Sequence, residues 1–328
     1  MKNILITGAS GFIGSHLARK LIDDNFLYLI DKYELNQSKN LAFLKNYKKN
    51  KFKFIKMDLS NDNLNILKQL KKVKIIYHCA SIVGVSKMKN PIDIHNQVVN
   101  VSKNLIEIFK KRKVLFVYFS SSEVYGDQTR FSEKKGKRIY PFSYKDEFTN
   151  IRWVYGEGKF FIETCLKYIN KNFQNFNYII LRPFNFFGPN QSFNFVIPKM
   201  INDLLTKKKI TIYKSSSTKR TFTFIDDAIK IIINLTKHEK NYNRIYNIGS
   251  KNTITLKTLS NKILKLYCEL EKKNLNLFQI KLDKNAIDPI LERKPEIFNL
   301  KKAFGKLNFE DFEKSLKKTM KSYLKKNK

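Results

Sequence analysis

Tyr155 and Lys159 are four residues apart, so they share one face of any helix that contains them. A phenol has an ordinary pKa of about 10 and is a poor base at neutral pH, but a nearby lysine ammonium favours the phenolate. The pair therefore predicts a proton acceptor for a hydroxyl group. Gly156 and Gly158 fall in the same turn, and each costs a helix about 1 kcal/mol relative to alanine, so something other than helix propensity must keep them. The alternative is a core tyrosine beside a solvated lysine.

A glycine-rich segment precedes these residues in the chain. Residues 7–14 read TGASGFIG, follow a strand-like run and lead into the helical run 15–22. Gly8 would allow a sharp turn, Gly11 would let backbone N–H groups approach a pyrophosphate, and Gly14 would let the helix lie close to the strand. The spacing is G-x-x-G-x-x-G. In this context it predicts a dinucleotide site, the alternative being a glycine turn without a ligand. A nicotinamide charge bound there would also favour the phenolate of Tyr155.

Two acidic residues follow predicted strands and are candidates for the adenosine end of that dinucleotide. Asp31 ends the second strand, where a carboxylate accepts hydrogen bonds from ribose hydroxyls and repels a 2′-phosphate. NAD is therefore favoured over NADP, although the neighbouring Lys32 weakens the preference. Asp58 closes the third strand and could bind the adenine edge, or could cap a turn.

The elements that must position these residues follow an alternating pattern. Short apolar runs predict strands at 3–7, 26–30, 52–57, 74–79, 114–120 and 177–181, with helical patterns between them. One such helix is expected over 91–113, with Val98, Val101, Leu105 and Ile108 on one face. This alternation predicts an α/β fold, a Rossmann-like doubly wound parallel sheet. The expected domains are 1–182, with a later contribution near 221–250, and a smaller α+β substrate-binding region over 183–328.

Several motifs in order resemble one known family. They are TGASGFIGSHL (7–17), YHCAS (77–81), SSSEVYGD (120–127), YGEGK (155–159), LRPFNFFGP (181–189), RTFTFIDD (220–227) and YNIGS (246–250). The chain resembles the extended short-chain dehydrogenases of the NAD-dependent epimerase/dehydratase family, which act on nucleotide sugars. The resemblance implies that Tyr155, Lys159, Ser121 and Glu123 are catalytic. It implies cofactor binding by Gly8, Gly11, Phe12, Ile13, Gly14, Asp31, Asp58, Leu59, Ala80 and Lys159.

Ser121 and Glu123 bear on the type of reaction. Ser121 matches the family's hydroxyl residue that holds the reacting sugar hydroxyl beside the tyrosine, although serines in such clusters also cap turns. Glu123 stands where plain 4-epimerases are usually not acidic, whereas 4,6-dehydratases and UDP-glucuronate decarboxylases carry Glu followed by Val-Tyr-Gly. Dehydratases pair that Glu with a preceding Asp, and this chain has Ser122. The Ser-Glu pair is closer to the decarboxylases, as is Arg152-Trp153 before Tyr155.

The resemblance also implies a set of substrate-binding residues, namely Ser122, Asn185, Arg220, Arg293 and Lys87. An arginine suits a diphosphate because its planar donors fork onto phosphate oxygens. Arg293 matches an arginine near the reacting sugar in decarboxylases, or is a surface charge at a helix end. Lys87 stands where decarboxylases have a tyrosine, so it would pair with a substrate carboxylate or face solvent.

Three outcomes are compatible with these residues: decarboxylation, dehydration and simple 4-epimerisation of a UDP- or dTDP-hexose, each through transient C4 oxidation with tightly held NAD. An alternative of another class is a catalytically silent NAD-binding scaffold or an RNA-associated protein. The resemblance further implies a homodimer formed through the helices that carry Asn100 and Tyr155.

The composition limits which binding partners are expected. The chain has 328 residues, a formal net charge of +36 and 42% hydrophobic residues. The charge comes mainly from lysines spread along the whole chain, and a nucleic-acid groove would more often concentrate arginines with stacking aromatics, so no specific nucleic acid is expected. The three cysteines and four histidines fall in no ligand pattern, and no metal is expected. The start resembles no signal peptide and no run would span a bilayer, so we expect a cytoplasmic protein.

Overall fold

The computed structural model describes residues 1–82, 90–126, 132–133, 151–213, 218–251, 253–283 and 292–325. The chain divides into two compact units. The first comprises Met1–Gly126, Lys135–Pro183 and Ile229–Asn247, and the second comprises Asp127–Lys134, Phe184–Ala228 and Ile248–Lys328. The late segment of the first unit is thus 229–247, narrower than the predicted 221–250, and the second unit also takes a short piece near residue 130. In the part of the chain described, no helix has the length and apolar character needed to cross a bilayer.

The first unit is built on a seven-stranded sheet in the order β11-β6-β5-β4-β1-β2-β3. Its strands are β1 (Asn3–Thr7), β2 (Phe26–Asp31), β3 (Phe52–Lys56), β4 (Val73–His78), β5 (Val114–Phe119), β6 (Phe176–Pro183) and β11 (Arg244–Ile248). All pairs from β3 to β6 are parallel. Every residue of β5 is buried, because a central parallel strand is covered on both faces. This is the predicted α/β fold with a Rossmann-like sheet.

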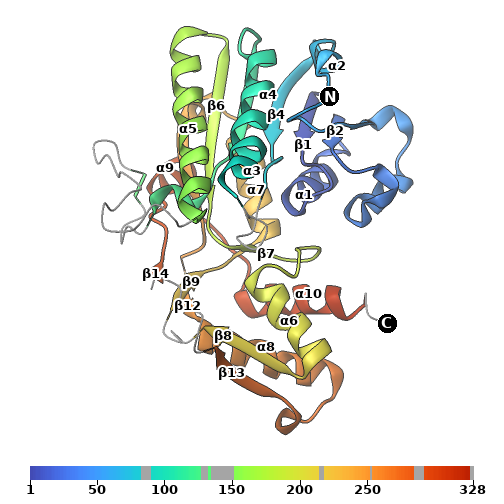
Figure 1. Cartoon of the computed structure of the whole chain (residues 1–328), viewed down its shortest axis with the longest axis vertical. Coiled ribbons are helices and arrows are strands. Elements are labelled where there is room, and N and C mark those ends of the chain that lie inside the picture. Colours follow the sequence, from blue (N-terminus) through green and yellow to red (C-terminus); the bar gives the residue numbers. More distant parts are fainter. Residues whose placement is uncertain are drawn as a thin grey trace. The chain divides into compact units, whose positions relative to one another are not determined.

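Helices of the first unit connect these strands. They are α1 (Phe12–Leu21), α2 (Asn65–Lys68), α3 (Pro91–His95), α4 (Val101–Phe109) and α5 (Ile151–Asn172), while α7 (Ile225–Leu235) begins in the second unit and continues into the first. Helices α4 and α5 run side by side (Figure 1). The helix predicted over 91–113 is not continuous, because a π-helical turn, Asn96–Asn100, lies between α3 and α4. Apolar spacing does not distinguish such a turn from an ordinary helical one. Ile108 is half-buried against the core and the other three predicted positions are fully buried.

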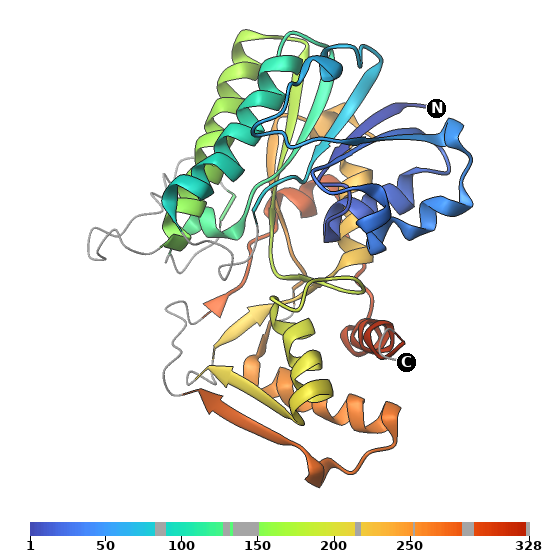
Figure 2. The ribbon, with the colours of Figure 1, turned by 45° about the vertical axis from the view of Figure 1, so that its right-hand side comes forward.

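The second unit combines short strands with four helices of its own among the described residues. The strands are β7 (Phe186–Phe187), β8 (Lys209–Tyr213), β9 (Lys219–Thr221), β10 (Thr223–Phe224), β12 (Thr253–Thr255), β13 (Gln279–Asp283) and β14 (Glu292–Arg293), and the helices are α6 (Val196–Lys207), α8 (Leu256–Glu271), α9 (Phe298–Phe304) and α10 (Phe312–Leu324). Strands β8 and β13 pair in parallel, with α6 and α8 packed against β8 (Figure 2). A three-stranded sheet has the order β12-β9-β14.

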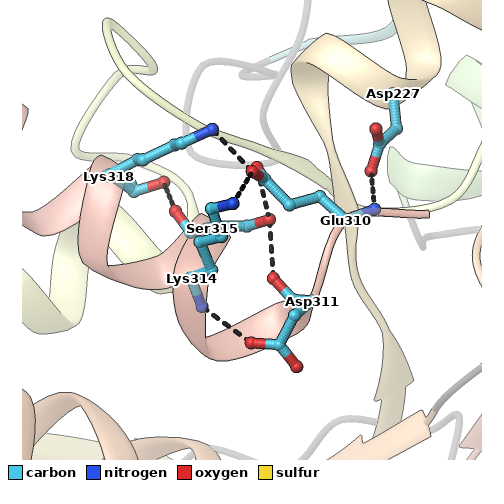
Figure 3. Close-up of polar contacts among 7 residues, drawn as sticks. Asp227, Glu310, Asp311, Lys314, Ser315 and Lys318 are labelled. Atoms are coloured by element: carbon cyan, nitrogen blue, oxygen red, sulfur yellow. Dashed lines mark hydrogen bonds and ion pairs between the residues drawn. The ribbon is translucent and has the colours of Figure 1, made fainter.

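The final helix of the second unit is anchored by carboxylates (Figure 3). Asp311 caps α10 by accepting a hydrogen bond from Lys314 N at 2.9 Å, and Asp227 accepts one from Glu310 N at 2.8 Å. Lys318 Nζ lies 2.6 Å from Glu310 Oε1. These carboxylates line part of a cavity of about 520 Å³ whose aromatic wall includes Phe187. Among the described residues, none of the predicted site residues lines this cavity, so it belongs to the packing of α10.

Candidate active site

The glycine turn joins β1 to α1 in a conformation that requires its glycines. Gly8 has a φ of +66°, and a Cβ there would lie 2.8 Å from the backbone nitrogen of Ala80. A Cβ on Gly14 would lie 2.2 Å from the carbonyl oxygen of Gly8, so only glycine lets α1 approach the turn this closely. The structure therefore brings Ala80, from the segment after β4, against the turn. Both backbone segments lie where the sheet's strands end, the usual position of a ligand in an open α/β sheet.

The start of α1 fits a pyrophosphate. Its N-cap is Gly11, which is exposed and has no side chain to satisfy the first N–H groups, and its first turn contains no acidic residue. Phe12 and Ile13 are half-buried at the first two helical positions. Unsatisfied N–H groups and the positive end of the helix dipole attract an anion at such a terminus. The residues present are thus those that a dinucleotide needs.

The two candidate residues for the adenosine end differ in their surroundings. Asp31 ends β2 and accepts hydrogen bonds from Ser10 N at 2.9 Å and from Tyr33 N at 3.3 Å. It therefore holds the glycine turn itself, and each oxygen keeps a lone pair for a ribose hydroxyl. Asp58 follows β3 and accepts two hydrogen bonds from Ser60, which cap a turn. Burial raises the pKa of Asp58, but these hydrogen bonds lower it, and the net result is a pKa below the ordinary value. The adjacent Leu59 is buried in the core.

Tyr155 and Lys159 lie on α5, and both side chains are buried. Lys159 Nζ donates a hydrogen bond to the carbonyl oxygen of Phe119, the last residue of β5, at 2.8 Å, and lies 5.7 Å from the centre of the Tyr155 ring. Ser121 is the second residue after β5 and accepts a hydrogen bond from Glu123 N at 3.1 Å. The Ser121 hydroxyl is also close enough to the Tyr155 phenol to lower its pKa. The structure thus brings the four predicted catalytic residues together.

Burial and charge set the protonation of this group. Burial raises the pKa of Tyr155, and the Glu123 carboxylate raises it further, while hydrogen bonds with Ser121 and Ser81 oppose the rise. Burial lowers the pKa of Lys159 to about 7, although attraction to Cys79 and Glu163 opposes this. The Lys159 cation is consequently present below pH 7 and is lost as the pH rises through that value. The phenol is protonated in the protein alone.

Close packing explains why the residue after Tyr155, Gly156, is a glycine. A Cβ on Gly156 would lie 2.6 Å from the carbonyl oxygen of Glu123, which belongs to the 3₁₀ turn Ser122–Tyr125. Backbone cannot yield as a flexible side chain can, so glycine here allows α5 to touch the turn. A Cβ on Gly158 would instead meet side-chain carbons of Val98 and Val99, at 3.3 and 3.4 Å. Gly156 therefore sets how near Glu123 lies to Tyr155.

We expect Gly156→Ala to lower kcat by at least about tenfold, because a displacement of even ~1 Å at reacting groups can cost a hundredfold. The matched control is Gly158→Ala in the same helical turn, which gains helix propensity of up to about 1 kcal/mol and meets only methyl groups. Steady-state kinetics and thermal unfolding of both variants would check this. Equal losses in the two variants would contradict a role for the Gly156 contact.

The residues predicted to bind the substrate's diphosphate belong to the second unit. Arg220 on β9 and Arg293 on β14 are register partners on neighbouring parallel strands, and both are buried. Register partners on neighbouring strands lie on the same face of the sheet, and two arginines there suit a ligand with several negative oxygens. Asn185 has a φ of +40° and donates from Nδ2 to the carbonyl oxygen of Thr221 at 2.9 Å. Ser122 is buried in the first unit, and Lys87 lies outside the described residues.

Some residues near Tyr155 were absent from the predicted site. The Ser81 side chain lowers the pKa of the Tyr155 phenol, and its position after β4 at the same sheet edge was an available signal. His78 is buried between Thr7 Oγ1, 2.7 Å from its Nδ1, and Ser102 Oγ, 3.0 Å from its Nε2. Burial lowers the pKa of His78 to about 3, so it is a neutral structural link between β1, β4 and α4.

Comparison with known proteins agrees with this arrangement. Residues 4–249 match the model of the NAD dependent epimerase/dehydratase family. A UDP-N-acetyl-alpha-D-glucosaminuronate decarboxylase of Bacillus cytotoxicus is 28% identical over 333 residues, covering 97% of each chain. A dTDP-D-glucose 4,6-dehydratase of Dictyostelium discoideum is 31% identical over 276 residues, covering 81% of this chain and 62% of that protein.

Among solved structures, a UDP-N-acetylglucosamine 4-epimerase of Methanobrevibacter ruminantium in complex with UDP-N-acetylmuramic acid is similar with a TM-score of 0.84 and 26% identity, covering 99% of both chains. These relatives are named for three different reactions on nucleotide sugars. The chain belongs to the NAD-dependent epimerase/dehydratase family of nucleotide-sugar enzymes, and its cofactor is NAD.

Proposed function

We propose that this enzyme transiently oxidises a UDP- or dTDP-linked hexose at C4 and that the oxidation leads to decarboxylation or dehydration at C5. The observation that carries the proposal is the buried Tyr155 phenol, whose pKa is raised by burial and by the Glu123 carboxylate and lowered by the Ser121 hydroxyl, so that both side chains act on it. Plain 4-epimerisation requires a base for the hydroxyl and no further carboxylate, so Glu123 favours chemistry at C5.

In the first step Tyr155 takes the proton of the C4 hydroxyl, which Ser121 holds in place, as the C4 hydride leaves. In the last step the hydride returns to the sugar, at C4 after decarboxylation or at C6 after dehydration, so the net change is loss of carbon dioxide or of water. When bound, NAD supplies a hydride acceptor and donor and a positive ring charge that opposes the effect of burial on the Tyr155 pKa. Lys159 adds a second positive charge in the range where it is protonated. Gly8, Gly11, Phe12, Ile13, Gly14, Asp31 and Ala80 would hold the dinucleotide, as would Asp58 and Leu59 at its adenine end.

A ketone at C4 activates C5. If C5 carries a carboxylate, the C5–C6 bond breaks, carbon dioxide leaves, and the bonding pair forms an enolate that takes a proton at C5. If C6 carries a hydroxyl, loss of the C5 proton and of that hydroxyl as water gives an alkene between C5 and C6. Glu123 is the carboxyl group available for either proton transfer. With Ser122 in place of a second acid, decarboxylation is favoured, as is consistent with the relative that matches 97% of the chain.

Substrate binding would rest on Arg220 and Arg293, whose paired guanidinium groups suit the diphosphate, and on Asn185 and Ser122. Lys87 would pair with a substrate carboxylate. The test is to incubate the purified protein with NAD and a panel of UDP-, dTDP-, GDP- and CDP-sugars, uronates included, and to measure product masses. Loss of carbon dioxide or of water supports the proposal. Conversion at unchanged mass would identify an epimerase, and an absence of turnover on the whole panel would favour the non-catalytic alternative.

We further propose a homodimer through α5. Phe161 and Tyr168 are 55% and 67% exposed, and they are two helical turns apart on one face of α5. Large apolar side chains gathered on one exposed face commonly mark an interface. We expect Tyr168→Glu to convert a dimer into a monomer in sedimentation velocity, while Asn234→Glu on the exposed side of α7 leaves it dimeric. A monomeric parent protein would contradict the proposal.

A further inference from the structure

Glu163 is a fully buried carboxylate one helical turn beyond Lys159 on α5. Arg182, at the end of β6, donates from Nε to Glu163 Oε1 at 2.9 Å and from Nη2 to Oε2 at 2.6 Å. Ser120 Oγ donates to Glu163 Oε1 at 2.6 Å. Burying two charges is costly, and the bidentate geometry with an added hydroxyl donor is what makes such a pair tolerable. Its position beside the catalytic lysine suggests a purpose beyond stability.

One stripe of α5 contacts three successive residues where β5 ends. Lys159 bonds to the carbonyl oxygen of Phe119, and Glu163 accepts from Ser120. Tyr155, on the same stripe, is close enough to the next residue, Ser121, for the serine hydroxyl to lower the pKa of the phenol. The contact made by Glu163 therefore lies immediately before the residue that holds the substrate hydroxyl in the proposed mechanism. A shift at Ser120 would move Ser121 with it, because the two share a peptide bond.

Arg182 extends the same network to the far end of this segment. Its guanidinium carbon lies 4.7 Å from the centre of the Tyr125 ring, and Tyr125 OH donates to Asn247 Oδ1 at 2.8 Å. Tyr125 ends the 3₁₀ turn that carries Glu123. The ion pair thus contacts the segment on both sides of Ser121 and Glu123. All of these residues belong to the first unit.

We propose that the buried Glu163–Arg182 ion pair positions the catalytic segment 120–125 against Tyr155. The inference rests on the proposed function, because that function assigns roles to Ser121 and Glu123. Glu163 and Arg182 are positioning residues, since each acts through other side chains. Gly156 brings α5 and the segment into contact, and the ion pair holds the segment in register.

The ion pair also affects the pKa of Lys159. The groups facing this lysine are Tyr155 and Glu163 from α5, Tyr118 from β5 with its ring centre 4.9 Å from Nζ, and His78 and Cys79 at the end of β4. Among the ionisable groups acting on it, Glu163 supplies the carboxylate that favours the cation. Removing the pair should therefore lower the pKa of Lys159 from its present value of about 7.

The test replaces both charges, because Glu163→Gln alone strands the buried Arg182 charge and can prevent folding. The variant is Glu163→Leu with Arg182→Met, which substitutes apolar side chains of similar size. Its matched control is Glu107→Leu with Lys110→Met, which removes a partly exposed ion pair of α4. Circular dichroism and thermal unfolding would show whether both variants fold.

We expect the Glu163/Arg182 variant to lose about 10- to 100-fold in kcat with little change in KM, and the control to match the parent. Adding Ser121→Ala should cost much less in that variant than in the parent, because Ser121 is already displaced. Unchanged kcat, or a full additional loss from Ser121→Ala, would overturn the proposal.

A separate measurement distinguishes this failure from a failure of the proposed function. The pKa of Lys159 can be followed by NMR of protein labelled with ¹³C at the lysine ε carbon, with the signal assigned by its loss in Lys159→Arg. If no nucleotide sugar is turned over, the proposed function fails, and this titration still tests the pair. A lower Lys159 pKa in the Glu163/Arg182 variant supports its contact with the site, and an unchanged titration overturns it.

Discussion

Tyr155→Phe is expected to lower kcat about 10²- to 10⁴-fold, the usual contribution of a positioned general base. The substitution removes one oxygen from a buried ring and leaves its packing on α5 intact. It also removes the hydroxyl that meets Ser121 and Ser81. Substrate KM and the amount of NAD that copurifies should change little, because the aromatic ring remains. Steady-state kinetics with the substrate found in the mass assay would measure the loss.

A second tyrosine provides the control for that experiment. Tyr267 on α8 is also buried, lies in the second unit, and its ring packs edge-on against Phe278. Tyr267→Phe should retain kcat within about twofold, since it also removes one oxygen from a buried ring and Tyr267 has no role in the proposed reaction. A Tyr155→Phe enzyme that kept the parent rate would exclude Tyr155 as the base.

Gly8→Ala is expected to destabilise the protein and to abolish tight NAD binding. A left-handed backbone costs a non-glycine residue roughly 1–2 kcal/mol, and overpacking against Ala80 adds about 1–3 kcal/mol more. The added methyl would also push apart the two backbone segments that shape the dinucleotide site. An affinity loss greater than tenfold corresponds to only about 1.4 kcal/mol, so calorimetric titration with NAD should detect it readily.

Gly305 offers an unusually close comparison. It has the same φ of +66°, but a Cβ there would meet no atom within 4 Å. Gly305→Ala therefore measures the cost of a positive φ without an added contact, here at a ψ of −103°, and a larger loss of stability at Gly8 in urea unfolding would point to the contact with Ala80. NAD affinity should be unchanged in Gly305→Ala. Equal unfolding free energies and equal NAD affinities in the two variants would show that the space around Gly8 is unimportant.

Strand positions and the fold class could be predicted because buried parallel strands have a strong signal in sequence. Strands β1 to β6 begin and end within one or two residues of the expected runs, since the central strands are apolar on both faces and the edge strand β3 alternates apolar and lysine residues. The helix over 91–113 was predicted less well. The π-helical turn at Asn96–Asn100 places Val98 and Val99 opposite Gly158, and such a turn arises from packing against α5 rather than from local spacing.

The sequence by itself determined the dinucleotide turn, the tyrosine–lysine pair and the family, because these depend on residue types at short, fixed spacings. Only the tertiary structure showed that Gly156 touches Glu123, that Arg220 and Arg293 are register partners, and that Glu163 and Arg182 form a buried ion pair. Each of these contacts joins residues from different elements, 33, 73 and 19 positions apart in the chain. Such pairings depend on strand order and helix packing, which local patterns do not encode residue by residue.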